Sequence, residues 1–176
     1  MYEFLKKINK SGKLVSIYAD VNDSDSYISG YVLCFDQEHL LLKNISSLGK
    51  YNGIVCLEID HIFKIEYDTI LLSIIDEKVL DEEKKIEDFR FKNVLVEFLD
   101  YIKRNEIVCS IELIDSLNVD AIGIVKQIED SYVIINTINE IGVYEGTIVL
   151  LIDKIKRIWS DSDDDRFCKE LLIQRK

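Results

Sequence analysis

The sequence predicts a mainly β protein made of two tandem, five-stranded, strongly bent β-barrels, each introduced by an α-helix. The first observation is an internal repeat: residues 30–69 align with residues 123–162 without a gap, at a spacing of 93 positions. The second is a helical apolar stripe before each copy. The third is a series of short apolar runs separated by glycine and aspartate. A repeat of this length is a small domain, which indicates a fused pair of one fold.

Twelve of the forty aligned positions are identical, where a chain of this composition would give about three by chance. The identical pairs are Gly30/Gly123, Val32/Val125, Ile45/Ile138, Gly49/Gly142, Tyr51/Tyr144, Gly53/Gly146, Leu57/Leu150, Ile59/Ile152, Asp60/Asp153, Ile62/Ile155, Ile65/Ile158 and Asp68/Asp161. Most are glycines, turn residues or aliphatics, the residues that define a fold. We therefore expect barrels at residues 1–78 and 89–176, joined by a charged linker at residues 79–88.

Within each copy, the elements follow from local patterns. Helices are expected at residues 2–9, ending before Gly12, and at residues 94–104, where apolar residues recur at i and i+4. The first strands are expected at residues 14–19 and 107–113, and later strands at residues 39–43 and 132–136. Gly30 and Gly123, inside the second strand, indicate the sharp bends that a small barrel requires.

The fourth strand carries alternating aliphatic residues. We assign one face to the barrel core: Val55, Leu57 and Ile59 in the first copy, and Ile148, Leu150 and Ile152 in the second. The opposite face of the second copy holds Val149 and Leu151. Exposure of both would be costly, so we expect a helix of this chain or another subunit to cover them, which makes them candidate interface residues.

The net charge of −11 and the pI near 4.7 disfavour long-range attraction to nucleic acid or anionic lipid, although a local basic site stays open. No apolar run is long enough to span a bilayer, and the first residues do not resemble a signal peptide. The four cysteines have no CxxC spacing. We expect a reduced, cytoplasmic compartment without membrane association.

Reactive groups are scarce. The two histidines both lie in the first copy, and no zinc-ligand spacing or nucleotide fingerprint is present. A nucleophilic pair of Cys34 with His61 stays open, but Cys34 lies in an apolar run that favours inert packing. The acidic turn at residues 160–165 could hold a hard cation, but an N-cap for the closing segment at residues 166–174 fits better. We expect no enzyme, cofactor or metal.

A helix followed by five short bent strands is the plan of the Sm/LSm family, and the first copy resembles that family in its residues. The segment Ile28–Asn44 reads ISGYVLCFDQEHLLLKN and resembles the first Sm motif, with a strand glycine, spaced aliphatics, Phe-Asp, and aliphatics ending at asparagine. It is most similar to Hfq, the bacterial Sm-type RNA chaperone, in its Phe-Asp-Gln and Leu-Leu-Lys-Asn stretches. The resemblance covers about forty residues in each half.

The resemblance implies RNA contacts around one loop and the third strand, from Phe35, Asp36, Gln37, His39, Lys43 and Asn44. The Tyr-Lys-His stretch of Hfq falls at residues 58–61 (EIDH), where only His61 matches. The second copy departs further, with Ile128, Glu129, Asp130 and Ser131 in place of residues 35–38. It keeps Tyr132 as a candidate stacking group.

Two non-enzymatic functions follow. The first is binding of single-stranded RNA through the barrel loops, to which Tyr132, Lys154 and Arg157 of the second copy would add stacking and phosphate contacts. The second is an acidic protein-interaction module, as an adaptor or an inhibitor of a basic partner. Strand edges could join proteins or copies of this chain, with Val149 and Leu151 at the interface.

Overall fold

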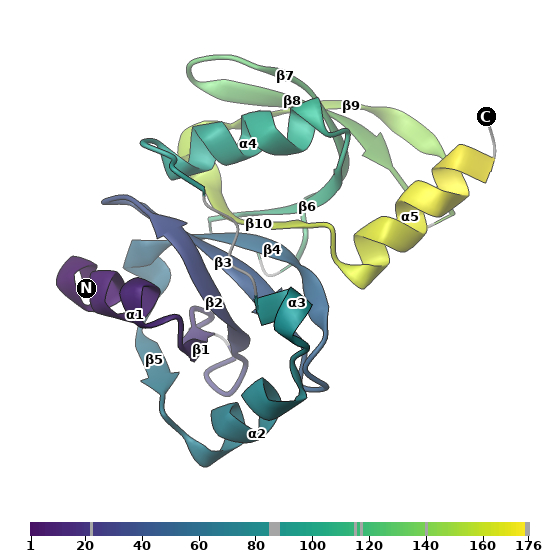
Figure 1. The fold of residues 1–176 in the computed structure, drawn as a ribbon. Helices are drawn as coiled ribbons and strands as arrows, with labels where there is room; N and C mark the ends of the chain where they lie inside the picture. Colours follow the sequence, from purple (N-terminus) through teal and green to yellow (C-terminus); the bar gives the residue numbers. More distant parts are fainter. Residues whose placement is uncertain (22, 85–88, 115, 117, 140, 175–176) are drawn as a thin grey trace. The chain divides into compact units, whose positions relative to one another are not determined.

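The computed structural model describes residues 1–21, 23–84, 89–114, 116, 118–139 and 141–174. The chain divides into two compact units, unit 1 (Met1–Val94) and unit 2 (Leu95–Lys176). Each is mainly β with short helices, as the sequence predicted (Figure 1). No described helix has the length and apolar character that crossing a bilayer requires.

Unit 1 begins with a helix, continues through five strands and ends in further helices. Its elements are α1 (Tyr2–Ser11), β1 (Leu14–Tyr18), β2 (Ile28–Phe35), β3 (His39–Ile45), β4 (Tyr51–Glu58), the short 3-10 helix η1 (Ile59–His61), β5 (Lys64–Tyr67), α2 (Ile70–Lys78) and α3 (Asp81–Lys84). Gly12 ends α1 in the left-handed conformation, with φ of 60°. The helix expected at residues 2–9 is thus confirmed, two residues longer.

The strands of unit 1 form an antiparallel sheet in the order β5-β1-β2-β3-β4. Among the described residues no pairing joins β5 to β4, so the sheet of the unit is open. The pairing of β2 with β3 shifts register between Val32 and Cys34, a bulge that bends the sheet. The helix α1 lies beside β2, and α2 packs against β1 (Figure 1).

Unit 2 repeats this plan. The helix α4 (Val94–Arg104) begins at the last residue of unit 1, and its bounds match the prediction. The remaining elements are β6 (Val108–Leu113), β7 (Ala121–Ile128), β8 (Tyr132–Ile138), β9 (Tyr144–Leu151), η2 (Ile152–Lys154), β10 (Ile155–Ser160) and α5 (Asp163–Gln174). The order β10-β6-β7-β8-β9 corresponds strand by strand to that of unit 1. A register shift between Val125 and Gln127 falls at the position equivalent to the first bulge.

The bend glycines lie where two strands approach closely. A Cβ atom added to Gly30 would lie 2.3 Å from the carbonyl oxygen of Lys43, and one added to Gly123 would lie 2.1 Å from that of Asn136. Neither position can hold a side chain unless the neighbouring backbone moves. Close approach of the neighbouring strand therefore explains why both copies have glycine at this position.

A helix packs against the sheet of each unit, and the two helices follow equivalent positions of the repeat. The helix α2 covers a core of unit 1 formed by Leu14, Tyr31, Ile45, Leu72, Ile75 and Val79. The helix α5 covers a smaller core of Val108, Ile138 and Leu172, with Ile122, Ile124 and Cys168 packed against it. The repeat thus extends beyond the forty residues that the sequence aligns.

The segment at residues 79–88, expected to be a linker, contains α3 (Asp81–Lys84), and residues 85–88 lie outside the described part of the chain. The boundary between the compact units lies at Val94. The acidic turn expected to cap the closing segment does so, and α5 begins three residues earlier than predicted.

The core expected on the fourth strand differs between the units. Val55 and Leu57 of β4 are 0% and 1% exposed, whereas Ile148 and Leu150 of β9 are only half-buried. In the described part of the chain β9 pairs with β8 alone, so solvent reaches it from the side that has no paired strand.

Candidate functional site

The turn between β2 and β3 places the first group of predicted RNA-binding residues. Phe35 ends β2 and is half-buried, while Gln37 is exposed. Asp36 Oδ1 accepts hydrogen bonds from the backbone N–H groups of Glu38 (2.8 Å) and His39 (2.7 Å). The second oxygen, Oδ2, accepts from the N–H of Val94 at 2.7 Å. The Asp36 carboxylate therefore holds backbone in place, which is the usual work of an aspartate in a turn.

The two histidines lie on either side of Glu58. His39 pairs with Glu58 across β3 and β4. Burial lowers the pKa of His39, although the nearby carboxylates of Asp36, Glu58 and Glu38 act in the opposite direction. His61 Nδ1 lies 2.9 Å from Glu58 Oε2. Glu58 is thus a neighbour of both His39 and His61, which the sequence separates by 22 positions.

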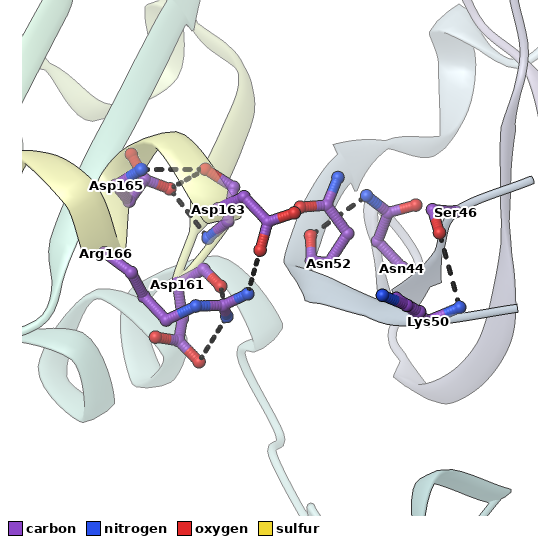
Figure 2. A network of polar contacts seen from close by, with 9 residues as sticks. Asn44, Ser46, Lys50, Asn52, Asp161, Asp163, Asp165 and Arg166 are labelled. Carbon is purple, nitrogen blue, oxygen red and sulfur yellow. Dashed lines mark hydrogen bonds and ion pairs between the residues drawn. The ribbon is translucent and has the colours of Figure 1, made fainter. Parts of the chain in front are cut away.

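Lys43 and Asn44 are buried in β3, at 9% and 6% exposure. Asn44 Nδ2 donates to the carbonyl oxygen of Asn52 at 3.0 Å, across the hairpin between β3 and β4 (Figure 2). The ammonium of Lys43 lies 5.5 Å from the ring centroid of Tyr51. Both side chains thus have structural contacts within unit 1.

The basic stretch at residues 154–158 divides into an exposed part and a buried part. The Lys154 side chain is 58% exposed, with Nζ 4.0 Å from Asp153 Oδ2. Lys156 Nζ lies 2.7 Å from Glu112 Oε1, and Arg157 Nε lies 3.2 Å from Glu112 Oε2. Lys154 remains accessible to a ligand, while Arg157 is only 9% exposed.

Val149 and Leu151 are the most accessible apolar residues among the predicted site residues. Val149 is 60% exposed and Leu151 is 52% exposed. They face the same side of the sheet as their cross-strand partners on β8, Ile134 and Tyr132. We call these four residues the β9 face. Of the two covers expected from the sequence, a helix of this chain or another subunit, the described helices of unit 2 leave Val149 and Leu151 exposed.

A pocket of about 650 Å³ lies in unit 2 at the start of β9. Aliphatic side chains of β7, β8 and β9 line it, among them Ile122, Ile138 and Ile148, and the carboxylates of Asp120 and Glu145 add negative charge. The pocket therefore adds apolar surface near the turn between β8 and β9.

Sequence reasoning missed two polar clusters, one partly buried and one buried. Tyr31 donates a hydrogen bond through its hydroxyl to Asp76 Oδ1, and Lys84 Nζ lies 2.9 Å from Asp76 Oδ2. In unit 2, Asp165 is 2% exposed and accepts from the hydroxyls of Ser110 (2.9 Å) and Ser162 (2.7 Å). The signal for the second group was present, because Ser162 and Asp165 have capping-box spacing.

The cysteine and acidic residues show little reactive character. Burial raises the pKa of the Cys56 thiol and that of the Cys109 thiol well above the ordinary value, which keeps both protonated at neutral pH. Across the described residues, no group of three or more histidine, cysteine or acidic side chains is arranged to hold a metal ion.

The accessible predicted site residues are therefore Gln37 in unit 1 and, in unit 2, Val149, Leu151 and Lys154. The pocket of unit 2 is a separate feature, because none of the four residues of the β9 face lines it. Comparison of the chain with family models, with curated proteins and with solved structures gave no match.

Proposed function

We propose that the chain is a non-enzymatic binding and assembly protein, built from two Sm-like barrels, that joins a second copy of itself through the β9 face. Support for the Sm-like barrels comes from the helix before each sheet and from the strand order, in which the fifth strand pairs with the first. Equivalent bulges and close-approach glycines bend both sheets in the way that a small barrel requires.

The exposure of Val149 and Leu151 carries the proposal of assembly. At the equivalent positions of β4 the residues are Cys56, which is 1% exposed, and Glu58, which is half-buried. An aliphatic pair open to water on an edge strand is a surface that natural proteins usually cover. Because the chain's own described helices leave it open, the cover that remains is another subunit.

The test is the mass of the full chain in solution, by light scattering after size exclusion over a range of concentrations. The wild type should exceed the 20.5 kDa of one chain and approach a multiple of it as concentration rises. Val149→Lys should shift the mass toward 20.5 kDa, because the edge then carries an unpaired charge.

Ile173→Lys is the matched control, since Ile173 of α5 is also 60% exposed. It should leave the mass unchanged. A wild-type chain that stays at 20.5 kDa at every concentration would refute assembly through the β9 face.

RNA binding is the second candidate, and one specific observation favours it. Tyr132 begins β8 and Lys154 ends η2, and these two elements lie side by side in unit 2, where the N–H of Ile152 donates to the carbonyl oxygen of Ser131. A half-buried aromatic ring and an exposed ammonium on neighbouring elements would allow stacking on a base and contact with a phosphate.

Fluorescence anisotropy with labelled oligo-uridine and oligo-adenine, at about 50 mM and about 200 mM salt, tests RNA binding. Lys154→Ala and Tyr132→Ala should each weaken binding, and Lys154→Ala should also reduce the salt dependence. If the wild type shows no micromolar binding at the lower salt concentration, RNA binding is excluded.

A further inference from the structure

Three aromatic rings come together in unit 1, away from β9. Tyr18 lies at the end of β1, Tyr27 just before β2, and Phe63 just before β5. The ring centroids of Tyr18 and Tyr27 are 5.5 Å apart, and those of Tyr18 and Phe63 are 6.3 Å apart. We call these rings the aromatic surface, and we propose that it binds a lysine or arginine side chain on a basic segment of a partner protein.

The rings are held in place and open to solvent. The N–H of Phe63 donates to the carbonyl oxygen of Tyr18 at 3.1 Å, which fixes the loop before β5 against β1. Tyr18 is 7% exposed and forms the floor, while Tyr27 and Phe63 are 38% and 46% exposed. Exposed tyrosine and phenylalanine on a rigid base are enriched at protein interfaces.

A cation already lies on this surface. Lys64 Nζ is 3.9 Å from the ring centroid of Tyr18, within the range of a cation–π contact. The same ammonium is 2.9 Å from Glu66 Oε1, and the Tyr18 hydroxyl donates to Glu66 Oε2 at 2.9 Å. The rings and the carboxylate thus form an environment that accepts an ammonium group, and Lys64 occupies only the face of Tyr18.

The surrounding charge selects a basic partner. Between Lys13 and Lys43 the sequence contains no lysine or arginine, and the turn between β1 and β2 carries Asp20, Asp23 and Asp25 beside Tyr27. With a net charge of −11 on the chain, this field attracts cations and repels phosphate groups. Nucleic acid and anionic membranes are therefore unsuitable occupants, whereas a lysine- or arginine-rich segment is complementary.

The aromatic surface belongs to unit 1 alone. The positions equivalent to Tyr18, Tyr27 and Phe63 in unit 2, by the pairing of their strands, are Glu112, Asp120 and Lys156. The duplicated barrel therefore provides one basic-segment site, which goes beyond assembly through the β9 face and does not depend on it.

The experiment measures binding of fluorescein-labelled octa-arginine to the full chain by anisotropy, with octa-glutamate as the negative probe. The wild type should bind octa-arginine and ignore octa-glutamate. Phe63→Ala combined with Tyr27→Ala should weaken binding by about tenfold or more. Because neither substitution changes the net charge, attraction by net charge alone would survive it.

Two controls make the outcome decisive. Phe167→Ala removes a phenylalanine of α5 that is 56% exposed, and it should leave the affinity unchanged. Lys64→Met should tighten binding more than Lys154→Met, since both remove one positive charge but only the first frees the ring of Tyr18.

The proposal is overturned if the wild type does not bind octa-arginine, if the double variant binds as tightly as the wild type, or if Lys64→Met and Lys154→Met have equal affinities. If circular dichroism shows that the double variant is unfolded, Tyr27→Ala alone replaces it in the comparison. Val149→Lys should bind octa-arginine like the wild type, so failure of assembly and failure of this proposal are separate results.

Discussion

Ser162 and Asp165 exchange hydrogen bonds at the start of α5. The N–H of Asp165 donates to Ser162 Oγ at 3.1 Å, and the N–H of Ser162 donates to Asp165 Oδ2 at 3.0 Å. Burial raises the pKa of Asp165, against the hydrogen bonds from Ser162 and Ser110. This reciprocal cap satisfies two backbone donors that the helix itself cannot.

We expect Asp165→Ala to lower the free energy of unfolding by about 1–3 kcal/mol, because the substitution removes the cap and leaves the half-buried Ser110 hydroxyl without its acceptor. Urea unfolding followed by circular dichroism measures this change. Asp164→Ala, at an exposed position of the same helix turn, is the control and should be close to neutral. Equal effects of the two substitutions would contradict the role of the cap.

Gly123→Ala and Gly146→Ala should differ strongly, although both replace a glycine of the same sheet. A Cβ at position 123 would lie 2.1 Å from the carbonyl oxygen of Asn136, whereas one at position 146 would meet no atom within 4 Å. We expect Gly123→Ala to cost about 1–3 kcal/mol or more, and Gly146→Ala to be neutral or slightly stabilising. Thermal unfolding of the two variants beside the wild type tests this difference.

The lowered pKa of His39, which burial causes, predicts a loss of stability on acidification. The unfolded chain binds a proton near pH 6.5, while the folded chain resists it. Stability should therefore fall as the pH drops below about 6.5 and through the folded pKa. His39→Gln should be less sensitive over this range. Melting temperatures of both proteins between neutral and mildly acidic pH measure the effect, and identical pH dependence would contradict it.

Tyr31→Phe should destabilise unit 1 at neutral pH by about 1 kcal/mol, because Asp76 loses the hydrogen bond from the tyrosine hydroxyl. Burial raises the pKa of Asp76, but the hydrogen bonds from Tyr31 and Lys84 outweigh this and hold it below the ordinary value. For a lowered carboxyl pKa, the stabilisation is present above the unfolded pKa and is lost as the pH falls through the folded pKa.

The difference between Tyr31→Phe and the wild type should therefore shrink below about pH 4, where the carboxylate becomes protonated. Urea titrations at neutral and acidic pH test this. A difference that persists undiminished at low pH would show that the hydroxyl acts through packing alone.

Much of the fold could be predicted because local rules fix it. Gly30 and Gly123 signal close approach of strands, and the apolar stripe at residues 94–104 signals a helix, without any knowledge of distant contacts. The closing helices were harder to find. Their capping residues are Thr69 in one copy and Ser162 in the other, which share a hydroxyl group, and the last identical pair of the alignment is Asp68/Asp161, just before them.

The candidate site was less predictable, because its residues depend on burial and pairing that arise only in three dimensions. In the linear sequence, nothing distinguishes Asp36 and Arg157 from polar residues that are available to a ligand. In the structure, the Asp36 carboxylate accepts hydrogen bonds from three backbone N–H groups, and Arg157 forms an ion pair with Glu112. Val149 was expected to be covered by a helix of this chain or by another subunit, and the sequence alone could not show that it is 60% exposed in unit 2. The aromatic surface brings together residues that are 45 positions apart.

The closing helices have a practical consequence for anyone who divides or recombines the two halves. Both begin one residue after the aligned repeat ends, and the aspartate before each capping residue, Asp68 or Asp161, has φ of 55°. A cut placed at residue 69 would strip α2 from Leu14 and Tyr31 and leave an apolar face in water. A segment that is exchanged between the two halves should therefore contain the first helix, the sheet and the closing helix together.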